Sequence, residues 1–309
     1  MTTYYIKRFL AVLGLGLLFI SCSKFTVEKI EDKNTNSDVQ VFSIKGSING
    51  FHYIPKEIKH KGLVVCFGGS EGSAGEWYAA DIANEGYEVL AVYYFGKENL
   101  PQILSEVPIE FFENVLDYIK KRGSNKKPIT LLGASKGAEL TALLTRYYPQ
   151  IDNLILFAPA SCVFQGLDYT SSKSSWTRKK EALPFITFTQ EVIEKISYEE
   201  NAIVLRPLYE AAVNEAAEEL RKKAEIDLSQ FKGKVLIFAG GDDCLWPGDF
   251  AAQAFKNQNP DNVDLHIFPK AGHAFGAPPI AGGVKLGGTQ EENTKAAIES
   301  RRIMFEFLN

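Results

Sequence analysis

Short apolar runs alternate with amphipathic segments along most of this 309-residue chain. Two early segments, residues 39–43 and 48–54, alternate apolar and polar positions and predict an antiparallel pair of strands. Continuous apolar runs further along predict buried strands at residues 62–67, 87–95, 128–132, 153–158, 235–238 and 263–268. One-sided apolar patterns predict helices at residues 77–84, 108–119, 138–144, 250–256 and 291–308. This alternation predicts an α/β fold with a mostly parallel sheet, covered by helices on both faces and preceded by an antiparallel leader.

Residues 163–232 interrupt the strand and helix rhythm. The segment is rich in Ser, Lys and Glu but carries several aromatic residues, and its Ala- and Glu-rich part, residues 208–224, predicts one helix. We interpret the segment as a cap inserted over the carboxyl edge of the sheet, with aromatic side chains that favour an apolar pocket. The alternative is a set of surface helices unrelated to substrate.

The N-terminus has the features of an export signal. Lys7 and Arg8 precede an apolar run, residues 9–20, that is too short to span a bilayer but suits a secretory signal. The segment that ends at Cys22 resembles a bacterial lipobox, in which the cysteine is lipidated and becomes the first mature residue. Residues 1–21 are therefore predicted to be a lipoprotein signal peptide, and the alternative is an ordinary cleaved signal.

A lipidated Cys22 would anchor the protein to a membrane of the cell envelope, either in the periplasm or at the outer-membrane leaflet. Residues 22–38 are mostly polar and are predicted to be a flexible tether. The catalytic domain is then expected to occupy residues 39–309.

Composition narrows the classes of partner and cofactor. The formal net charge is −4 and 45% of the residues are hydrophobic, so we expect a globular domain that does not bind nucleic acid. No histidine and cysteine cluster has the spacing of a metal site, so no metal is expected. Four cysteines are present. Cys162 and Cys244 follow strands that we expect side by side, which leaves one disulfide as an alternative to the favoured free thiols.

The strongest chemical motif is Gly133-Ala134-Ser135-Lys136-Gly137. It lies between a predicted buried strand and a predicted helix, which is the context of a nucleophile elbow that exposes a serine above the sheet. The glycines leave room for the neighbouring strand and helix. A serine hydroxyl needs a base within hydrogen-bond reach, so the motif predicts a histidine partner for Ser135.

Only four histidines are present. His273 follows the strand at residues 263–268 and therefore emerges at the same sheet edge as Ser135. An acid is expected to orient His273, and Asp242 and Asp243 both follow the preceding strand. We favour Asp243, because a hydrophobic residue and a proline follow it closely at 246–247, and we expect Asp242 to satisfy loop amides.

Backbone N–H groups are expected to stabilise the oxyanion. One donor is the amide of Lys136, directly after the nucleophile, and the other is the amide of Gly69 or Ser70 in a glycine-rich turn. This turn lacks the Lys-Ser/Thr pair of a Walker loop. We expect no cofactor.

These motifs together resemble one family, the C-terminal catalytic domain of acyl-CoA thioesterases and bile acid-CoA:amino acid N-acyltransferases, of the dienelactone-hydrolase-like α/β-hydrolase fold. The resemblance extends over residues 60–308 and is carried by Phe67-Gly68-Gly69-Ser70-Glu71-Gly72, Gly133-Ala134-Ser135-Lys136-Gly137-Ala138-Glu139, Gly241-Asp242-Asp243, Ala271-Gly272-His273 and Gly287-Gly288-Thr289. The family implies a Ser or Cys nucleophile with Asp and His. These roles fall on Ser135, Asp243 and His273.

The expected function is hydrolysis of small-molecule acyl thioesters or esters through an acyl-enzyme. Its alternatives are acyl transfer to an amine or sugar, and a carboxylesterase activity on esters outside the cytoplasm. A binding protein that keeps the hydrolase fold is a further alternative, which the complete set of three residues disfavours.

Overall fold

The computed structural model describes residues 25–122, 127–168 and 170–309. The predicted signal peptide and Cys22 lie outside the described residues. Within the described ranges, no helix has the length and the apolar character that crossing a bilayer would need.

A large mixed sheet forms the centre of the molecule. Its parallel strands are β4 (Leu63–Phe67), β5 (Val89–Tyr93), β7 (Ile129–Ala134), β8 (Asn153–Phe157), β13 (Val235–Gly240) and β14 (Val263–Phe268). Three antiparallel strands precede them: β1 (Phe25–Ile30), β2 (Val39–Gly46) and β3 (Asn49–Pro55). The nine strands run in the order β1-β2-β3-β5-β4-β7-β8-β13-β14. The predicted α/β architecture with an antiparallel leader is confirmed.

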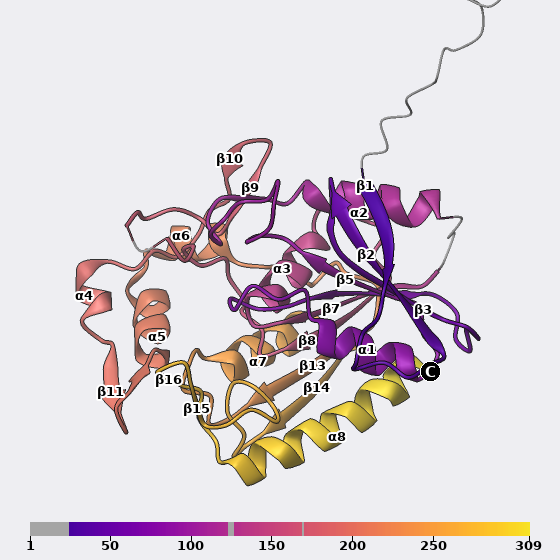
Figure 1. Ribbon diagram of the computed structural model, residues 1–309. Helices are drawn as coiled ribbons and strands as arrows, with labels where there is room; N and C mark the ends of the chain where they lie inside the picture. The colour runs from indigo at the N-terminus through magenta and orange to yellow at the C-terminus, as the bar shows by residue number, and fades with distance from the viewer. Residues whose placement is uncertain (1–24, 123–126, 169) are drawn as a thin grey trace, which may run out of the picture.

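Helices cover both faces of the sheet, which is why its central strands are apolar throughout. One face packs against α2 (Phe111–Lys121), α3 (Lys136–Leu144) and α7 (Gly248–Gln258). The other face packs against α1 (Glu76–Asn84) and α8 (Gln290–Leu308). Figure 1 shows α2 and α8 on opposite sides of the sheet. In β4, Val65 and Phe67 belong to the first cluster, whereas Val64 and Cys66 belong to the second, as the two-residue period of a strand requires.

The leading strand β1 corrects part of the predicted tether. Residues 25–30 pair with β2 along their whole length, so this part of the segment belongs to the sheet. Phe25 and Val27 pack against the core, and the ring of Phe25 meets that of Tyr118 edge-on at 5.0 Å. The adjacent charged residues Glu28 and Lys29 interrupt the apolar alternation of this short segment, so the sequence does not indicate a strand. The segment becomes a strand because it pairs with β2.

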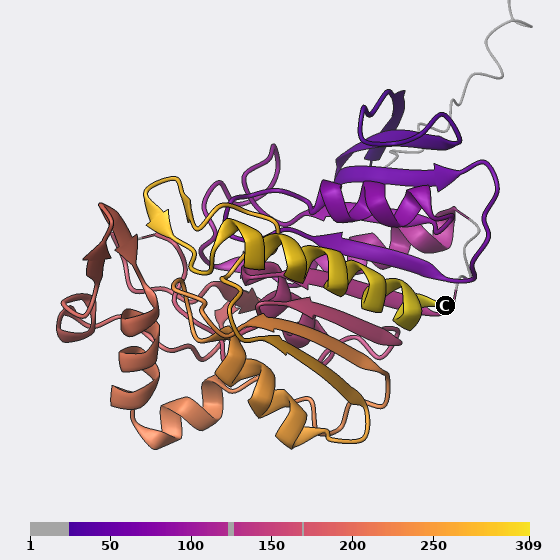
Figure 2. The ribbon, with the colours of Figure 1, turned by 90° about the horizontal axis from the view of Figure 1, so that it is seen from below.

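The insertion forms its own small elements. Strands β9 (Trp176–Arg178) and β10 (Glu181–Ala182) form a sheet with β6 (Val107–Pro108). Strands β11 (Ser197–Glu199) and β12 (Ala202–Val204) form another with β15 (Ile280–Ala281) and β16 (Val284–Lys285). Its helices are α4 (Gln190–Ile193), α5 (Arg206–Glu215) and α6 (Glu218–Ala224). In Figure 2 the insertion, in salmon, lies at the opposite end of the molecule from the leading strands, in indigo.

The single helix predicted over residues 208–224 is wrong, because two helices occupy this segment. Ala216 and Ala217 adopt extended backbone, with ψ angles of 139° and 141°, and separate α5 from α6. The break lets Ala212 of α5 and Ala224 of α6 enter the same apolar cluster. Tertiary burial therefore overrides the helix propensity of the two alanines.

The described cysteines, Cys66, Cys162 and Cys244, are free thiols. The disulfide alternative is therefore absent from the described part of the chain.

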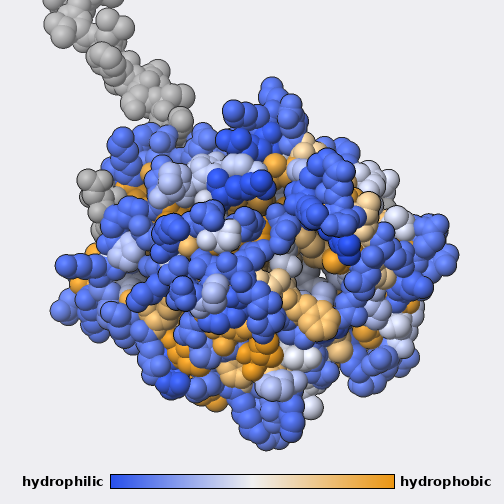
Figure 3. Space-filling view, turned by 180° about the vertical axis from the view of Figure 1, so that it is seen from behind, coloured by the Kyte–Doolittle hydropathy of each residue, from blue (hydrophilic) through white to orange (hydrophobic). Residues whose placement is uncertain are grey.

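The face of the molecule seen from behind is mostly hydrophilic, with hydrophobic patches between the charged and polar residues (Figure 3).

Candidate active site

Ser135 occupies a strained turn between β7 and α3. Its φ of 55° and ψ of −121° lie outside the regions that most L-residues adopt, and its amide donates to the carbonyl of Phe157 at 2.9 Å. The turn brings backbones into close approach. A methyl group at Gly137 would lie 2.2 Å from the oxygen of Gly68, and one at Gly133 would lie 2.2 Å from the oxygen of Gly137. Only glycine fits at these two positions.

His273 lies between the serine and an acid. Its Nε2 is 2.9 Å from Oγ of Ser135, and its Nδ1 is 2.8 Å from Oδ2 of Asp243. The loop after β14 presents the ring, and the His273 amide donates to the carbonyl of Leu286 at 2.7 Å. The Trp246 ring system packs against the imidazole in a T-shaped arrangement at a centroid distance of 5.7 Å. These contacts fix the ring between a hydroxyl and a carboxylate, the arrangement that can transfer a proton from a serine.

The two adjacent aspartates have different partners. Asp243 is 1% exposed and contacts His273, whereas Asp242 is exposed and its Oδ2 accepts from the amide of Gly288 at 3.0 Å. The structure therefore brings Asp243 to the histidine and leaves Asp242 in the turn.

Arg206, the first residue of helix α5 in the insertion, contacts the loop that carries Asp243, which we call the acid loop. Arg206 donates to the main-chain oxygen of Asp243 at 3.1 Å and forms ion pairs with Asp249 at 2.9 Å and Glu210 at 2.7 Å. Sequence motifs did not indicate this arginine, because Asp243 and Asp249 lie more than thirty positions away from it along the chain.

The predicted oxyanion donors are not equivalent. Lys136 is the first residue of α3, so its amide has no partner inside the helix. The amide of Gly69 donates to Oε1 of Glu71 at 2.9 Å and is therefore occupied. Ser70 lines the cavity above Ser135, and no described residue accepts a hydrogen bond from its amide. Of the two alternatives, Ser70 is the better placed donor.

The side chain of Lys136 points into the protein. Its Nζ lies 2.9 Å from Glu139 and 2.8 Å from Oγ of Ser175, and the Trp176 indole donates to Glu139 at 2.8 Å. Lys136 and Glu139 are 2% and 0% exposed. Burial raises the pKa of Glu139, while the Lys136 charge and the hydrogen bonds oppose that rise. The sequence motif indicated only a backbone role for Lys136, and no local signal pointed to this buried ion pair.

A cavity of about 600 Å³ opens beside Ser135 and His273. Most of its walls are apolar, as is usual for sites that bind small organic molecules. Beyond those two residues, the lining residues are Gly69, Ser70, Glu71, Trp77, Tyr78, Ala134, Phe157, Ala158, Leu245, Ala274, Phe275, Ala277, Ala281, Gly282, Val284 and Leu286.

None of residues 163–232 lines this cavity, which corrects the prediction that aromatic side chains of the cap build the pocket. The aromatic rings of Phe164, Phe188 and Tyr209 pack instead with Trp246 in a core of their own. Part of the cavity wall comes instead from residues 274–286, for which the sequence motifs gave no pocket assignment.

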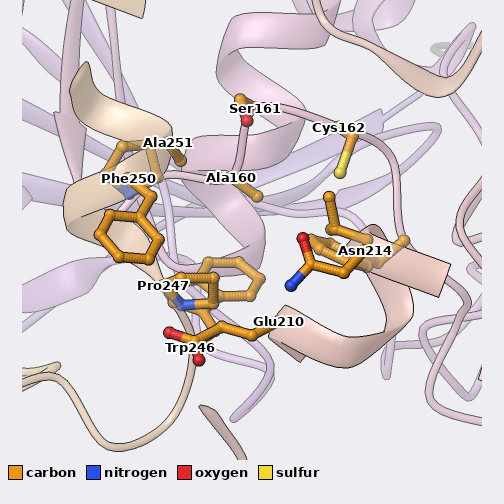
Figure 4. A pocket seen from close by; sticks show the side chains of 12 residues that line it. Ala160, Ser161, Cys162, Glu210, Asn214, Trp246, Pro247, Phe250 and Ala251 are labelled. Carbon is orange, nitrogen blue, oxygen red and sulfur yellow. The ribbon is translucent and has the colours of Figure 1, made fainter. Parts of the chain in front are cut away.

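A second, smaller cavity of about 200 Å³ lies behind the acid loop. Figure 4 shows Glu210 and Asn214 of α5 on one side of it and Phe250 on the other. Trp246 lines this cavity and also packs on His273, which lines the cavity at Ser135. In the part of the chain that the structure describes, no group of His, Cys, Asp and Glu side chains could hold a metal ion.

Sequence comparison places the chain in a family. The sequence model described as BAAT / Acyl-CoA thioester hydrolase C terminal matches residues 107–282, which is more than half of the chain. The chain belongs to this family. The resemblance inferred from the sequence motifs is thereby confirmed.

Curated relatives of the BAAT / acyl-CoA thioester hydrolase family share about a quarter of their residues with this chain. Human acyl-coenzyme A thioesterase 6 is 25% identical over 229 residues, covering 72% of this chain and 51% of the relative. Mouse acyl-coenzyme A thioesterase 6 is 28% identical over 237 residues, covering 74% of this chain and 52% of the relative. The chain therefore spans about half the length of the curated relatives it matches.

Solved structures support the α/β-hydrolase fold of this family member. An acetyl xylan esterase from Paenibacillus sp. R4 superposes with a TM-score of 0.52 at 15% identity, covering 92% of this chain and 87% of that chain. An esterase from Pyrococcus furiosus superposes with a TM-score of 0.50 at 14% identity, covering 92% of this chain and 90% of that chain. At this identity the likeness concerns the fold alone.

Proposed function

We propose that this protein is a serine hydrolase that cleaves acyl esters or thioesters. The observation that carries the proposal is the continuous contact from Ser135 through His273 to Asp243, with distances of 2.9 and 2.8 Å. The strained turn that presents the serine, the free amide at the start of α3 and the adjacent apolar cavity all fit this chemistry. Membership of a thioester hydrolase family supports it.

The first half of the reaction acylates the serine. Ser135 Oγ attacks the acyl carbonyl while Nε2 of His273 takes its proton, and Asp243 stabilises the imidazolium through Nδ1. The negative oxygen of the tetrahedral intermediate accepts hydrogen bonds from the amides of Lys136 and Ser70. The intermediate then collapses, the bond to the alcohol or thiol breaks, and His273 gives its proton to the departing oxygen or sulfur.

The second half releases the acid. His273 takes a proton from water, which attacks the acyl-enzyme, and the same donors stabilise the second intermediate. Collapse breaks the ester bond to Ser135, and the proton on His273 returns to Oγ. The chain, the substrate and one water account for every proton and bond in these steps.

The decisive variant is Ser135→Ala. We expect it to lower kcat/KM for p-nitrophenyl butyrate by at least about 10³-fold and to abolish labelling by a fluorophosphonate, because no other group can form the acyl-enzyme. Ser161→Ala is the matched control, since Ser161 lines the second cavity and not the cavity at Ser135. Full activity in Ser135→Ala, or labelling at another residue, would contradict the proposal.

Hydrolysis and acyl transfer are distinguished by their products. With glycine or glucose added, we expect the free acid to remain the main product, because the mostly apolar lining of the cavity offers few partners to a polar acceptor. A dominant amide or sugar ester would replace hydrolysis by transfer as the function.

We also propose that the protein is exported and anchored to the cell envelope through a lipid on Cys22. The proposal rests on the sequence of residues 7–22. Mass spectrometry of the mature N-terminus tests it: a diacylglyceryl Cys22 is expected, and an unmodified residue 22 would reject it.

A further inference from the structure

The cavity at Ser135 contains little that could hold a negatively charged ligand. Among the described residues that line it, no lysine or arginine is present, and Glu71 is the only carboxylate. Apart from Glu71 and His273, every lining side chain is uncharged. The cavity itself therefore offers an anionic substrate no fixed positive side chain.

Glu71 is held close to the nucleophile. Its Oε1 accepts from the amide of Gly69 at 2.9 Å and from the hydroxyl of Ser73. A methyl group at Gly69 would lie 2.6 Å from the other carboxylate oxygen and 3.1 Å from Cβ of Ser135, so carboxylate and nucleophile flank the same glycine. Glu71 lines the cavity, so its carboxylate lies at the cavity wall beside the nucleophile.

The lysine on the hairpin beside the cavity is already paired. Lys285 lies in the hairpin that supplies Val284 and Leu286 to the wall, but its Nζ is 2.9 Å from Glu199 and 2.9 Å from Glu200. One lysine is thus matched by two carboxylates, which are 58% and 68% exposed. Lys285 therefore offers no unpaired positive charge beside the cavity.

From this charge pattern we infer that the site selects acyl esters and thioesters whose leaving group is uncharged or positively charged, and that it disfavours polyanionic carriers such as coenzyme A. The inference rests on the proposed hydrolase function and concerns its substrate class. A site can discriminate against a ligand by presenting charge of the same sign, as well as by lacking attractive contacts to it. The substrates inferred for this chain therefore differ from the acyl-coenzyme A that appears in the names of its curated relatives.

Three butyryl thioesters test the inference, because they share the acyl group and the bond that is cleaved. Butyrylthiocholine is cationic, S-butyryl-N-acetylcysteamine is neutral and butyryl-coenzyme A is anionic, and a thiol reagent measures all three products. At low ionic strength we expect kcat/KM for the cationic and neutral thioesters to exceed that for the CoA ester by about tenfold or more. The ratio is expected to shrink in about 0.5 M salt, because salt screens exposed charges.

Two variants identify the groups responsible. Glu71→Gln keeps the shape and the acceptor for Gly69, and Glu200→Gln removes one of the two carboxylates beside Lys285. Each is expected to reduce the neutral-to-CoA ratio of kcat/KM by about threefold or more. Any general effect of Glu71 on the oxyanion applies to both thioesters and cancels in the ratio. Glu113→Gln, on the exposed side of α2 and away from the cavity, should leave the ratio unchanged.

The outcomes separate the inference from the function on which it rests. Equal or faster turnover of the CoA ester, or a ratio unaffected by Glu71→Gln and Glu200→Gln, would overturn the inference and leave the hydrolase function in place. Turnover of none of the three thioesters, together with no labelling of Ser135 by a fluorophosphonate, would reject both.

Discussion

At the residue scale, Asp243 is fixed through each of its oxygens. Oδ2 contacts His273, and Oδ1 accepts from the amides of Leu245 at 2.8 Å and Trp246 at 3.2 Å. Its main-chain oxygen accepts from Arg206. A carboxylate held in this way keeps the proton of His273 on Nδ1, which leaves Nε2 free to accept a proton from Ser135.

Replacing either aspartate by asparagine tests this assignment. Asp243→Asn is expected to lower kcat for p-nitrophenyl butyrate by about 10³-fold to 10⁴-fold with little change in KM, because the amide no longer selects the productive tautomer. Asp242→Asn, the matched control, should stay within about threefold, since an asparagine oxygen still accepts from Gly288. Steady-state kinetics decide the question, and an Asp243→Asn enzyme with more than a tenth of wild-type kcat would remove the acid role.

At the element scale, helix α3 joins the nucleophile to the insertion. The helix begins directly after Ser135, and its Lys136 and Glu139 contact Ser175 and Trp176 at the start of β9. The Lys136 and Glu139 side chains are almost completely buried, so each charge depends on the other for its stabilisation. The first turn of α3, which carries the proposed oxyanion donor Lys136, is thereby fixed to a distant segment of the chain.

A double-mutant cycle measures how strongly this pair is coupled. Lys136→Met and Glu139→Gln are each expected to lower the free energy of unfolding by about 3 kcal/mol, because each leaves a partner buried without its counter-charge. The double variant should lose less than the two single variants together. Urea denaturation measures the three values. The exposed pair of Glu218 and Lys222 on α6 is the control, and the same cycle there should show no coupling.

Additive losses in the Lys136 and Glu139 cycle would contradict this account of α3. Steady-state kinetics give a second measure, because a loss of stability alone does not change kcat or KM of the molecules that remain folded. In folded single variants at low temperature, kcat should fall more than KM rises, because the displaced amide of Lys136 acts on the intermediate and not on the bound substrate.

At the scale of the whole molecule, the core holds phenol groups that ionise far more easily once the chain unfolds. Burial raises the pKa of Tyr87 and of Tyr148 to about 12, whereas a phenol in an unfolded chain ionises near 10. Between these pH values the unfolded chain has lost protons that the folded protein still binds. The free energy of unfolding must therefore fall as the pH rises through this window.

Alkaline unfolding tests this expectation. The urea midpoint should be steady up to about pH 9 and then decline as the pH approaches 12. Tyr148→Phe should decline less steeply, because one of the contributing phenols is gone, whereas Tyr198→Phe removes a phenol that is 72% exposed and should follow the wild type. Identical slopes for Tyr148→Phe and the wild type would show that burial of this phenol does not act on stability.

Much of the fold and of the candidate site could be predicted from local features of the sequence. Apolar runs and one-sided patterns placed the six parallel strands and the helices between them, because burial periodicity depends on neighbouring residues. Ser135 and His273 could be predicted to meet, since both follow parallel strands and such strands end at one edge of the sheet. Strand order along the chain was enough for this inference.

The remaining features depend on contacts between residues far apart in the sequence. Strand β1 forms because β2 lies beside it and pairs with it. Helices α5 and α6 are separate because the break between them lets Ala212 and Ala224 enter the same apolar cluster. Residues 274–286 form part of the cavity wall only in the folded chain. The sequence determined which residue types could act as nucleophile, base and acid. Tertiary structure alone decided that Asp243 faces the histidine, that Gly69 is occupied by Glu71, and that Lys136 is buried with Glu139. Hydrogen bonds depend on tenths of an ångström and on orientation, and neither quantity is contained in the spacing of residues along a chain.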